Sequence, residues 1–207
     1  MDKKKYKIIL ASNSPRRREL LAGLDIPFEV KVIKGIDESF PDTLDAYETA
    51  EYIAQKKAAA YRSLLEQPSE GTELLILTAD TVVIAPTADE QNDREGRGVI
   101  LGKPRDAADA CRMLRMLSGK THHVVTGVCL TTARMQHHFS VTTEVSFKQF
   151  TDEEIDYYVS HYKPFDKAGA YGIQEWIGYI GCTGLQGSYY NVMGFPVQRI
   201  YEELQQM

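Results

Sequence analysis

Apolar and polar positions along the chain follow either the period of two that is typical of strands or the longer period that is typical of helices. The strongest strand signal lies at 74–84, written LLILTADTVVI, and its nearly continuous apolar character predicts a central strand covered on both faces. The other patterns predict strands at 6–11, 28–33, 99–101, 121–132 and 138–149, and helices at 15–24, 45–66, 104–118, from 151 onwards and at 195–206.

Turn and capping signals separate these elements. Residues 86–98, written PTADEQNDREGRG, are polar and rich in turn formers, which indicates a long hairpin connection between two strands. The two β-prone runs at 121–132 and 138–149 are adjacent, so we expect them to pair antiparallel. Thr151 and Glu154 have the spacing of a capping box, which predicts the start of the helix there.

The chain of 207 residues has the length of one domain, expected at 1–207, and neither a repeat nor a linker divides it. Apolar residues make up 43% and charged residues 26%, the balance of an ordinary soluble globular protein. No uninterrupted apolar run approaches the roughly 20 residues that span a bilayer, and no leader pattern opens the sequence. We therefore expect a cytoplasmic protein that does not bind membranes.

Charge and cysteine content exclude further classes. The net charge of -5 argues against binding to nucleic acid, although a local cationic pocket remains compatible with it. Cys111, Cys129 and Cys182 are widely spaced and odd in number, so they predict buried free thiols rather than disulfides or a zinc site. The histidine pairs at 122–123 and 137–138 lie in β-prone runs, where neighbours point to opposite faces, and are expected on the sheet surface.

Three consecutive arginines follow the first strand, in the segment ASNSPRRRELL at 11–21. Ser14 favours a helix N-cap and Pro15 the first helical position, so a strand is expected to lead directly into a helix N-terminus. The exposed N–H groups of such a terminus bind anions, and Ser12, Arg16 and Arg17 would add donors suited to phosphate oxygens. The alternative interpretation places these arginines on a solvated helix face.

Several separate segments carry a resemblance to a known family: SPRRRELL at 14–21, DE at 37–38, KA at 57–58, ADTVV at 79–83, LGKP at 101–104, GAYGIQ at 169–174 and GSYYNVMGFP at 187–196. In this order, and with the first segment extended to SNSPRRRELL at 12–21, they resemble the signatures of the Maf family, the septum-formation-protein-like nucleoside triphosphate pyrophosphatases. The resemblance runs from residue 8 to about residue 200. The connection at 86–98 is longer than is typical of the family, which raises the question of oligomer contacts or a lid near the cleft.

The resemblance implies an α/β fold with a long twisted mixed β-sheet flanked by helices and a central cleft between two lobes, similar to inosine triphosphate pyrophosphatases. It also implies hydrolysis of dTTP and UTP to the monophosphate and pyrophosphate, and a possible homodimer. The alternative function, suggested by the septum-formation name, is a nucleotide-binding regulatory protein of cell division with little or no catalysis.

The resemblance assigns roles to charged residues. Asp80 would accept the proton of the attacking water, and a rigid strand is a good place to hold such a base. Glu38 and Asp80 would bind a divalent metal cation, Mg or Mn, through oxygen ligands. Lys57 and Lys103 would pair with phosphate charges. The alternatives are a solvated loop acid at Glu38 and an ordinary helix-surface lysine at Lys57.

Base selectivity is expected from other positions. The Gln174 amide presents a donor and an acceptor side by side, which complements the edge of uracil or thymine. By resemblance, Arg16 and Thr81 would be the other two specificity positions. Trp176 is expected to pack at the cleft wall, and its stacking on the base is a further hypothesis.

Overall fold

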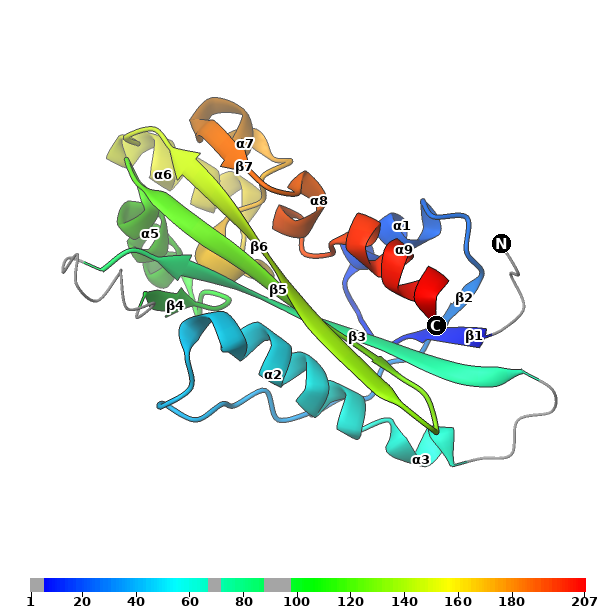
Figure 1. The fold of residues 1–207 in the computed structure, drawn as a ribbon. Coiled ribbons are helices and arrows are strands. Elements are labelled where there is room, and N and C mark those ends of the chain that lie inside the picture. Colours follow the sequence, from blue (N-terminus) through cyan, green and yellow to red (C-terminus); the bar gives the residue numbers. More distant parts are fainter. Residues whose placement is uncertain (1–5, 67–71, 88–97) are drawn as a thin grey trace.

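The computed structural model describes residues 6–66, 72–87 and 98–207. Within them, seven strands form one open, twisted sheet in the order β2-β1-β3-β5-β6-β7, with β4 also pairing with β3 (Figure 1). β1 pairs in parallel with β2 and β3, and the remaining pairs are antiparallel. The strands are β1 Tyr6–Leu10, β2 Phe28–Val30, β3 Glu73–Ala85, β4 Val99–Leu101, β5 Thr121–Thr131, β6 Gln136–Phe147 and β7 Cys182–Gln186.

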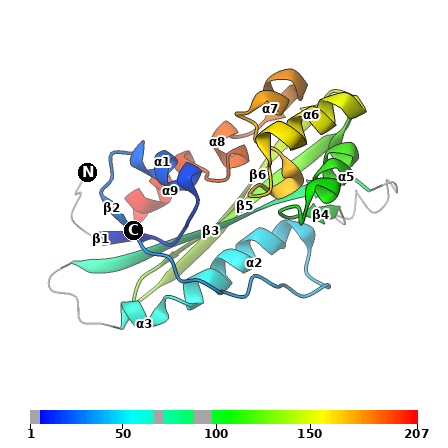
Figure 2. The ribbon, with the colours of Figure 1, turned by 180° about the vertical axis from the view of Figure 1, so that it is seen from behind.

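Helices cover both faces of the sheet (Figures 1 and 2). The long helix α2 lies along one face, while α1 and α9 gather on the other face at one end and α5 to α8 at the opposite end. The α/β mixed-sheet architecture expected from the sequence is therefore confirmed. The helices are α1 Pro15–Ala22, α2 Ala46–Ala59, α3 Arg62–Leu65, α5 Ala107–Leu117, α6 Asp152–Tyr162, α7 Trp176–Gly181, α8 Tyr189–Val192 and α9 Val197–Gln206, with a short 3-10 turn at Ala168–Ala170.

The alternation of side chains along β3 separates two hydrophobic cores on the same face of the sheet. Leu75 and Leu77 pack in the core that α1 and α9 cover, whereas Val83 and Ala85 belong to the core beneath α5 and α6. Each core supports one lobe. Thr81 shares this face because side chains at alternate positions point the same way, and it lies between the two cores.

The pairing of β3 changes abruptly along one of its edges. β1 pairs with β3 as far as Leu77, and β4 pairs with β3 from Val83 onwards. On this edge the strands of the described residues leave 78–82 without a partner, while β5 continues alongside on the other edge. This open edge lies where β1 ends and α1 begins, which is the usual position of a ligand site in an open α/β sheet.

The predicted helix at 45–66 is wrong in its extent, because the structure divides it into α2 and α3 around Tyr61. The Tyr61 ring is buried, and its hydroxyl donates to the carbonyl of Lys31 at 3.0 Å and accepts from the Ile33 N–H at 2.9 Å. These contacts hold the irregular segment that follows β2 against the junction of α2 and α3. Helix propensity does not include such long-range contacts. The helical pattern of the sequence continues across Tyr61, so it predicted one helix instead of two.

Other expectations are resolved individually. The antiparallel pairing of β5 with β6 and the capping box at Thr151 are confirmed. β3 and β4 pair antiparallel, as expected of a hairpin, whereas residues 88–97 of the long connection lie outside the described residues. β2 is shorter than predicted, and α7, β7 and α8 had no counterpart in the prediction. No described helix is long and apolar enough to cross a membrane.

The surface position expected for His122 is wrong. Its side chain is fully buried among aromatic rings, with its Nε2 atom 2.8 Å from the Tyr171 hydroxyl. Burial, together with the smaller effect of the neighbouring His123, lowers the pKa of His122 to about 3, so the ring is neutral at physiological pH. The three cysteines are free, and Cys129 is buried whereas Cys111 and Cys182 are only partly so.

Candidate functional site

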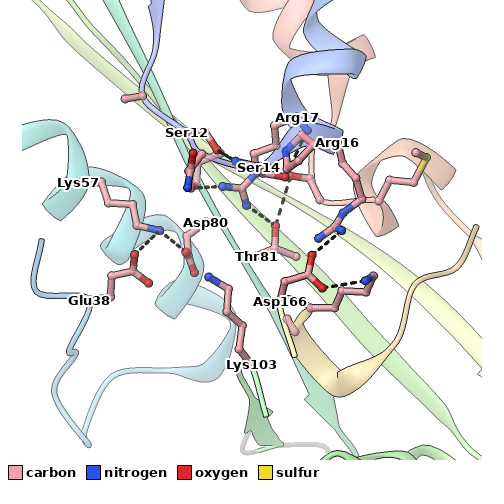
Figure 3. Close-up of a pocket in the computed structure, with 18 of the residues that line it drawn as sticks. Ser12, Ser14, Arg16, Arg17, Glu38, Lys57, Asp80, Thr81, Lys103 and Asp166 are labelled. Carbon is pink, nitrogen blue, oxygen red and sulfur yellow. Dashed lines mark hydrogen bonds and ion pairs between the residues drawn. The ribbon is translucent and has the colours of Figure 1, made fainter. Parts of the chain in front are cut away.

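A cleft of about 390 Å³ opens between the two lobes at the open edge of β3. Its volume is within the range of small-molecule sites. Five cationic side chains and three carboxylates line it, contributed by both lobes and by the segment that follows β2 (Figure 3). The charged residues of the lining are Arg16, Arg17, Lys57, Lys103, Lys167, Glu38, Asp80 and Asp166.

Two carboxylates converge on one ammonium group at one wall of the cleft. Lys57 Nζ lies 2.6 Å from Asp80 Oδ1 and 3.1 Å from Glu38 Oε1 (Figure 3). Asp80 comes from the open edge of β3 and Lys57 from α2, and both side chains are largely shielded from solvent. The solvated-surface alternative for Lys57 is therefore wrong. Glu38 is half exposed, which leaves it accessible to a ligand in the cleft.

The close approach of α2 to the sheet brings Lys57 to Asp80. Gly127 of β5 pairs with Asp80, and a Cβ atom at Gly127 would lie 2.2 Å from the backbone nitrogen of Glu51 in α2. A glycine is required here because any larger residue would collide with the helix backbone. Lys57, which follows Glu51 in the same helix, consequently reaches the strand.

The turn between β1 and α1 contributes polar groups to the cleft. Ser14 caps α1, as predicted, with its hydroxyl accepting from the Arg17 N–H at 3.4 Å, and Pro15 occupies the first turn. Ser12 is buried, and its hydroxyl accepts from the Ser14 N–H at 3.2 Å. The helix N-terminus faces the cleft, where its remaining N–H groups and its dipole favour an anion.

Arg17 makes more contacts within the protein than the sequence indicated. Its guanidinium donates to the Gly194 carbonyl at 2.8 Å, to the Ala79 carbonyl at 2.7 Å and to the Thr81 hydroxyl at 3.0 Å. Burial lowers the pKa of Arg17, which Asp80 partly offsets, but arginine remains protonated at any ordinary pH. Since three of its five N–H groups have protein acceptors, two are left for a ligand.

The other arginines lie differently. Arg16 Nη1 lies 2.9 Å from Asp166 Oδ2 in the opposite lobe (Figure 3). Arg18 is exposed on the helix surface, so the solvated-face interpretation holds for this arginine. Both Arg16 and Arg17 line the cleft.

Lys103 and Gln174 line the cleft, and the polar ends of their side chains make no ion pair or hydrogen bond with other described residues. Within the described residues, Lys103 has no ion-pair partner and the Gln174 amide has no hydrogen bond, although both belong to the lining. Thr81 also faces the cleft, and its hydroxyl lies 3.0 Å from the Thr126 hydroxyl. The structure thus brings every predicted site residue into one cleft.

Sequence reasoning missed polar residues of the lining and misplaced Trp176. Asp166, Lys167 and Tyr171 line the cleft, and the signal that could have found them is their position in or directly before the GAYGIQ segment. Trp176 is not part of the cleft lining, so the predicted cleft-wall position is wrong. Its ring centroid lies 4.8 Å from that of Tyr157, in the packing between α7 and α6.

The donors around Asp80 fit a divalent cation only in part. Oxygen ligands suit Mg²⁺ or Mn²⁺, and Glu38 and Asp80 present their carboxylates toward a common point, now bridged by Lys57. The described residues contain no group of three or more acidic, histidine or cysteine side chains that could hold a metal ion. A cation bound here would therefore take its remaining ligands from a substrate and water, as Mg²⁺ commonly does.

Comparison with protein families identifies the chain. The model of the family described as Maf-like protein matches residues 7–207. The chain belongs to the Maf family. The match covers both lobes of the Maf fold and all of the cleft-lining residues described above.

Individual Maf relatives are similar over nearly their whole length. Proteins named dTTP/UTP pyrophosphatase are 58% identical in Phocaeicola vulgatus, over 98% of this chain and 97% of the relative, and 53% identical in Parabacteroides distasonis, over 97% and 96%. A third, from Porphyromonas gingivalis, is 52% identical over 97% and 94%. Among solved structures, a HAM1 protein from Coxiella burnetii matches 98% of this chain and 100% of its own, with 17% identity and a TM-score of 0.42.

Proposed function

We propose that this Maf protein hydrolyses dTTP and UTP to the nucleoside monophosphate and pyrophosphate. The names of its relatives from Phocaeicola vulgatus and Parabacteroides distasonis support this reaction and these substrates. The structural observation that carries the proposal is the division of the cleft: Glu38 and Asp80 meet at Lys57 on one wall, and cationic groups from both lobes line the remaining volume, where Asp166 is the third carboxylate. A triphosphate needs such cations, and its attacking water needs a base.

Asp80 is the group that would accept the proton of the attacking water. Its carboxylate is held by Lys57 at 2.6 Å and by the rigid strand β3, so its position is fixed before the substrate binds. Lys103, Arg17 and the N-terminus of α1 would neutralise the charge of the phosphates. Gln174, Arg16 and Thr81 would contact the base, Gln174 through the amide donor and acceptor that match a uracil or thymine edge.

A divalent cation, Mg²⁺ or Mn²⁺, is part of the proposal. Glu38 and Asp80 would hold it, and when bound it supplies charge neutralisation at the phosphate oxygens. Lys57 has a second role, since its ammonium already screens the repulsion between the two carboxylates.

The first experiment assays UTP, dTTP, CTP, GTP and 7-methyl-GTP separately with Mg²⁺, and identifies the products by phosphorus NMR. We expect pyrophosphate from UTP and dTTP. Pyrophosphate mainly from 7-methyl-GTP would contradict the assigned substrates, and release of orthophosphate would contradict the assigned bond.

Asp80→Asn separates hydrolysis from mere nucleotide binding. The amide keeps the size of the carboxylate but accepts no proton, so turnover should fall by at least about 100-fold. Calorimetry should still detect nucleotide binding by the variant. Parent protein that binds UTP without hydrolysing it would favour the regulatory alternative, and undiminished turnover by the variant would exclude Asp80 as the base.

A further inference from the structure

A continuous chain of charged side chains crosses the cleft from α1 to α6. Arg16 Nη1 lies 2.9 Å from one oxygen of Asp166, and the other oxygen accepts from Lys167 Nζ at 2.8 Å. Lys167 Nζ also lies 3.0 Å from one oxygen of Glu175. The second Glu175 oxygen accepts a hydrogen bond from the Tyr158 hydroxyl. These contacts tie α1 in one lobe to α6 in the other.

The middle of this chain is shielded from water. The Lys167 side chain is only 9% exposed and that of Glu175 21%, whereas Asp166 is 56% exposed. Burial alone would raise the pKa of Asp166, but the hydrogen bonds from Lys167 and Arg16 outweigh it and lower the pKa. Shielded charges tolerate only arrangements in which each has a partner, because an unpaired buried charge is costly. The chain therefore restricts the geometry of the residues that it joins.

The same chain anchors the segment that carries Gln174. The Gly172 N–H donates to the Tyr158 hydroxyl at 3.0 Å, and the Glu175 N–H donates to the Gly172 carbonyl at 3.0 Å. A Cβ atom at Gly172 would lie 2.8 Å from Glu175 Cδ, so the carboxylate packs directly on the glycine backbone. Gln174 sits between these two anchors and lines the cleft with its amide unbonded among the described residues.

The chemistry of an amide makes a second residue necessary for base selection. Rotation of the Gln174 amide by half a turn exchanges its donor and acceptor, so glutamine alone matches uracil in one orientation and cytosine in the other. A guanidinium carries only donors, and it favours the carbonyl oxygen of uracil over the exocyclic amine of cytosine. Arg16 can remove the ambiguity of Gln174 only if the two side chains keep a fixed separation.

We propose that Asp166, Lys167 and Glu175 are positioning residues that hold Arg16 and Gln174 in register across the cleft, and thereby set the preference for a uracil-type base over cytosine. This inference rests on the proposed function, because it takes pyrimidine nucleoside triphosphates as the substrates.

Asp166→Asn tests the inference most directly. The amide keeps the size of the side chain but removes the charge that holds Arg16, so the ratio of kcat/KM for UTP to that for CTP should fall about tenfold. The melting temperature should change little, since the Asp166 side chain is 56% exposed and an ion pair with one exposed partner contributes little to stability. A purely structural role would lower the activity toward UTP and CTP equally and leave their ratio unchanged, which would overturn the inference.

A matched control and a double variant sharpen the result. Asp152→Asn breaks an exposed ion pair with Arg115 that lies outside the cleft lining, and it should leave the UTP/CTP ratio unchanged. Asp166→Glu keeps the charge and should restore part of the ratio. Because Asp166 acts through Arg16, adding Asp166→Asn to Arg16→Met should cost no further selectivity; independent, additive losses would contradict this coupling.

Binding without turnover distinguishes the inference from the proposed function. The α,β-methylene analogues of UTP and CTP cannot be cleaved at the proposed bond, so calorimetry with them reports base preference alone. Loss of uridine preference in Asp166→Asn would support the inference even if the parent protein released no pyrophosphate. If the parent protein hydrolyses UTP and Asp166→Asn keeps the same preference for the uridine analogue, only the inference is overturned. If the parent protein binds neither analogue, the inference and the proposed function are both overturned.

Discussion

At the scale of a single residue, the Arg17 side chain bonds to the part of the β3 edge that no described strand covers. Leu77 gives its carbonyl to the Ala11 N–H, and the carbonyl two residues later, that of Ala79, points toward the same edge after β1 has ended. The Arg17 guanidinium takes the place of the missing strand there, and it also holds the carbonyl of Gly194. One side chain thus joins α1, β3 and the segment before α9.

Arg17→Lys should show that this geometry, rather than the positive charge, is required. An ammonium lacks the planar fork that reaches three acceptors, so we expect the free energy of unfolding to fall by about 1–3 kcal/mol and kcat/KM for UTP by at least about tenfold. Urea denaturation and kinetics measure both. Arg18→Lys, at the exposed neighbour, is the control. Lost activity with unchanged stability would instead indicate that Arg17 acts mainly on the phosphates.

His122 should make stability depend on pH. Its folded pKa of about 3 lies below the ordinary value of 6.5, so the unfolded chain binds more protons between these values and the folded state loses stability as the pH falls. The loss is at most about 1.4 kcal/mol per pH unit. Urea titrations at several pH values give the unfolding free energy as a function of pH, and its slope should be smaller for His122→Gln than for the parent protein. The control His161→Gln, at an exposed residue, should retain the parent slope. Equal slopes for all three proteins would refute the assignment.

At the scale of elements, the sequence predicted most strands and helices, and of the strand pairings it predicted only the two hairpins, β3 with β4 and β5 with β6. The apolar run at 74–84 located β3, because a strand covered on both faces needs apolar side chains throughout. The open edge at 78–82 was not predictable, since it depends on where β1 and β4 end relative to β3. The sequence likewise located Asp80 and Arg16 in the site, but not Asp166, whose hydrogen bond with Arg16 joins residues 150 positions apart in the chain.

The contact of α2 with β5 positions Lys57, and it should be sensitive to one methyl group. Gly127→Ala would place a Cβ atom against the backbone of α2, so we expect unfolding free energy to fall by about 1–3 kcal/mol and kcat for UTP to fall as Lys57 moves from Asp80. Gly184→Ala in β7 is the control, because its Cβ atom would meet only ordinary contacts at 3.6 Å. Wild-type activity in Gly127→Ala would show that α2 can shift without disturbing the site.

At the scale of the whole molecule, the cleft is cationic although the chain has a negative net charge. The protein carries a net charge of -5, yet the cleft between its lobes has five cationic side chains against three carboxylates. A net negative charge disfavours nonspecific binding of polyanions, whereas cations that line a cleft raise the local concentration of a small anion. A net charge computed from the sequence does not register this separation, because it depends on how the two lobes meet.

Salt should therefore weaken substrate binding more than it slows chemistry. Raising KCl from about 0.05 to about 0.5 M shortens the screening length, so KM for UTP should rise severalfold while kcat changes little. Lys103→Met removes a cation that has no ion-pair partner in the described structure, and its KM should be higher but less dependent on salt. A KM that does not respond to salt would contradict an electrostatic origin of binding.

The open edge of β3 also bears on how such proteins can diversify. Asp80 and Thr81 are adjacent in the chain, but Asp80 faces Lys57 of α2 and Thr81 faces Arg17 of α1. Both reach the same cleft because no strand covers the edge between them. With the roles proposed for these residues, substitutions on the Thr81 face would alter which base is accepted while the Asp80 face is inherited unchanged, so new substrate preferences could evolve without rebuilding the hydrolytic group.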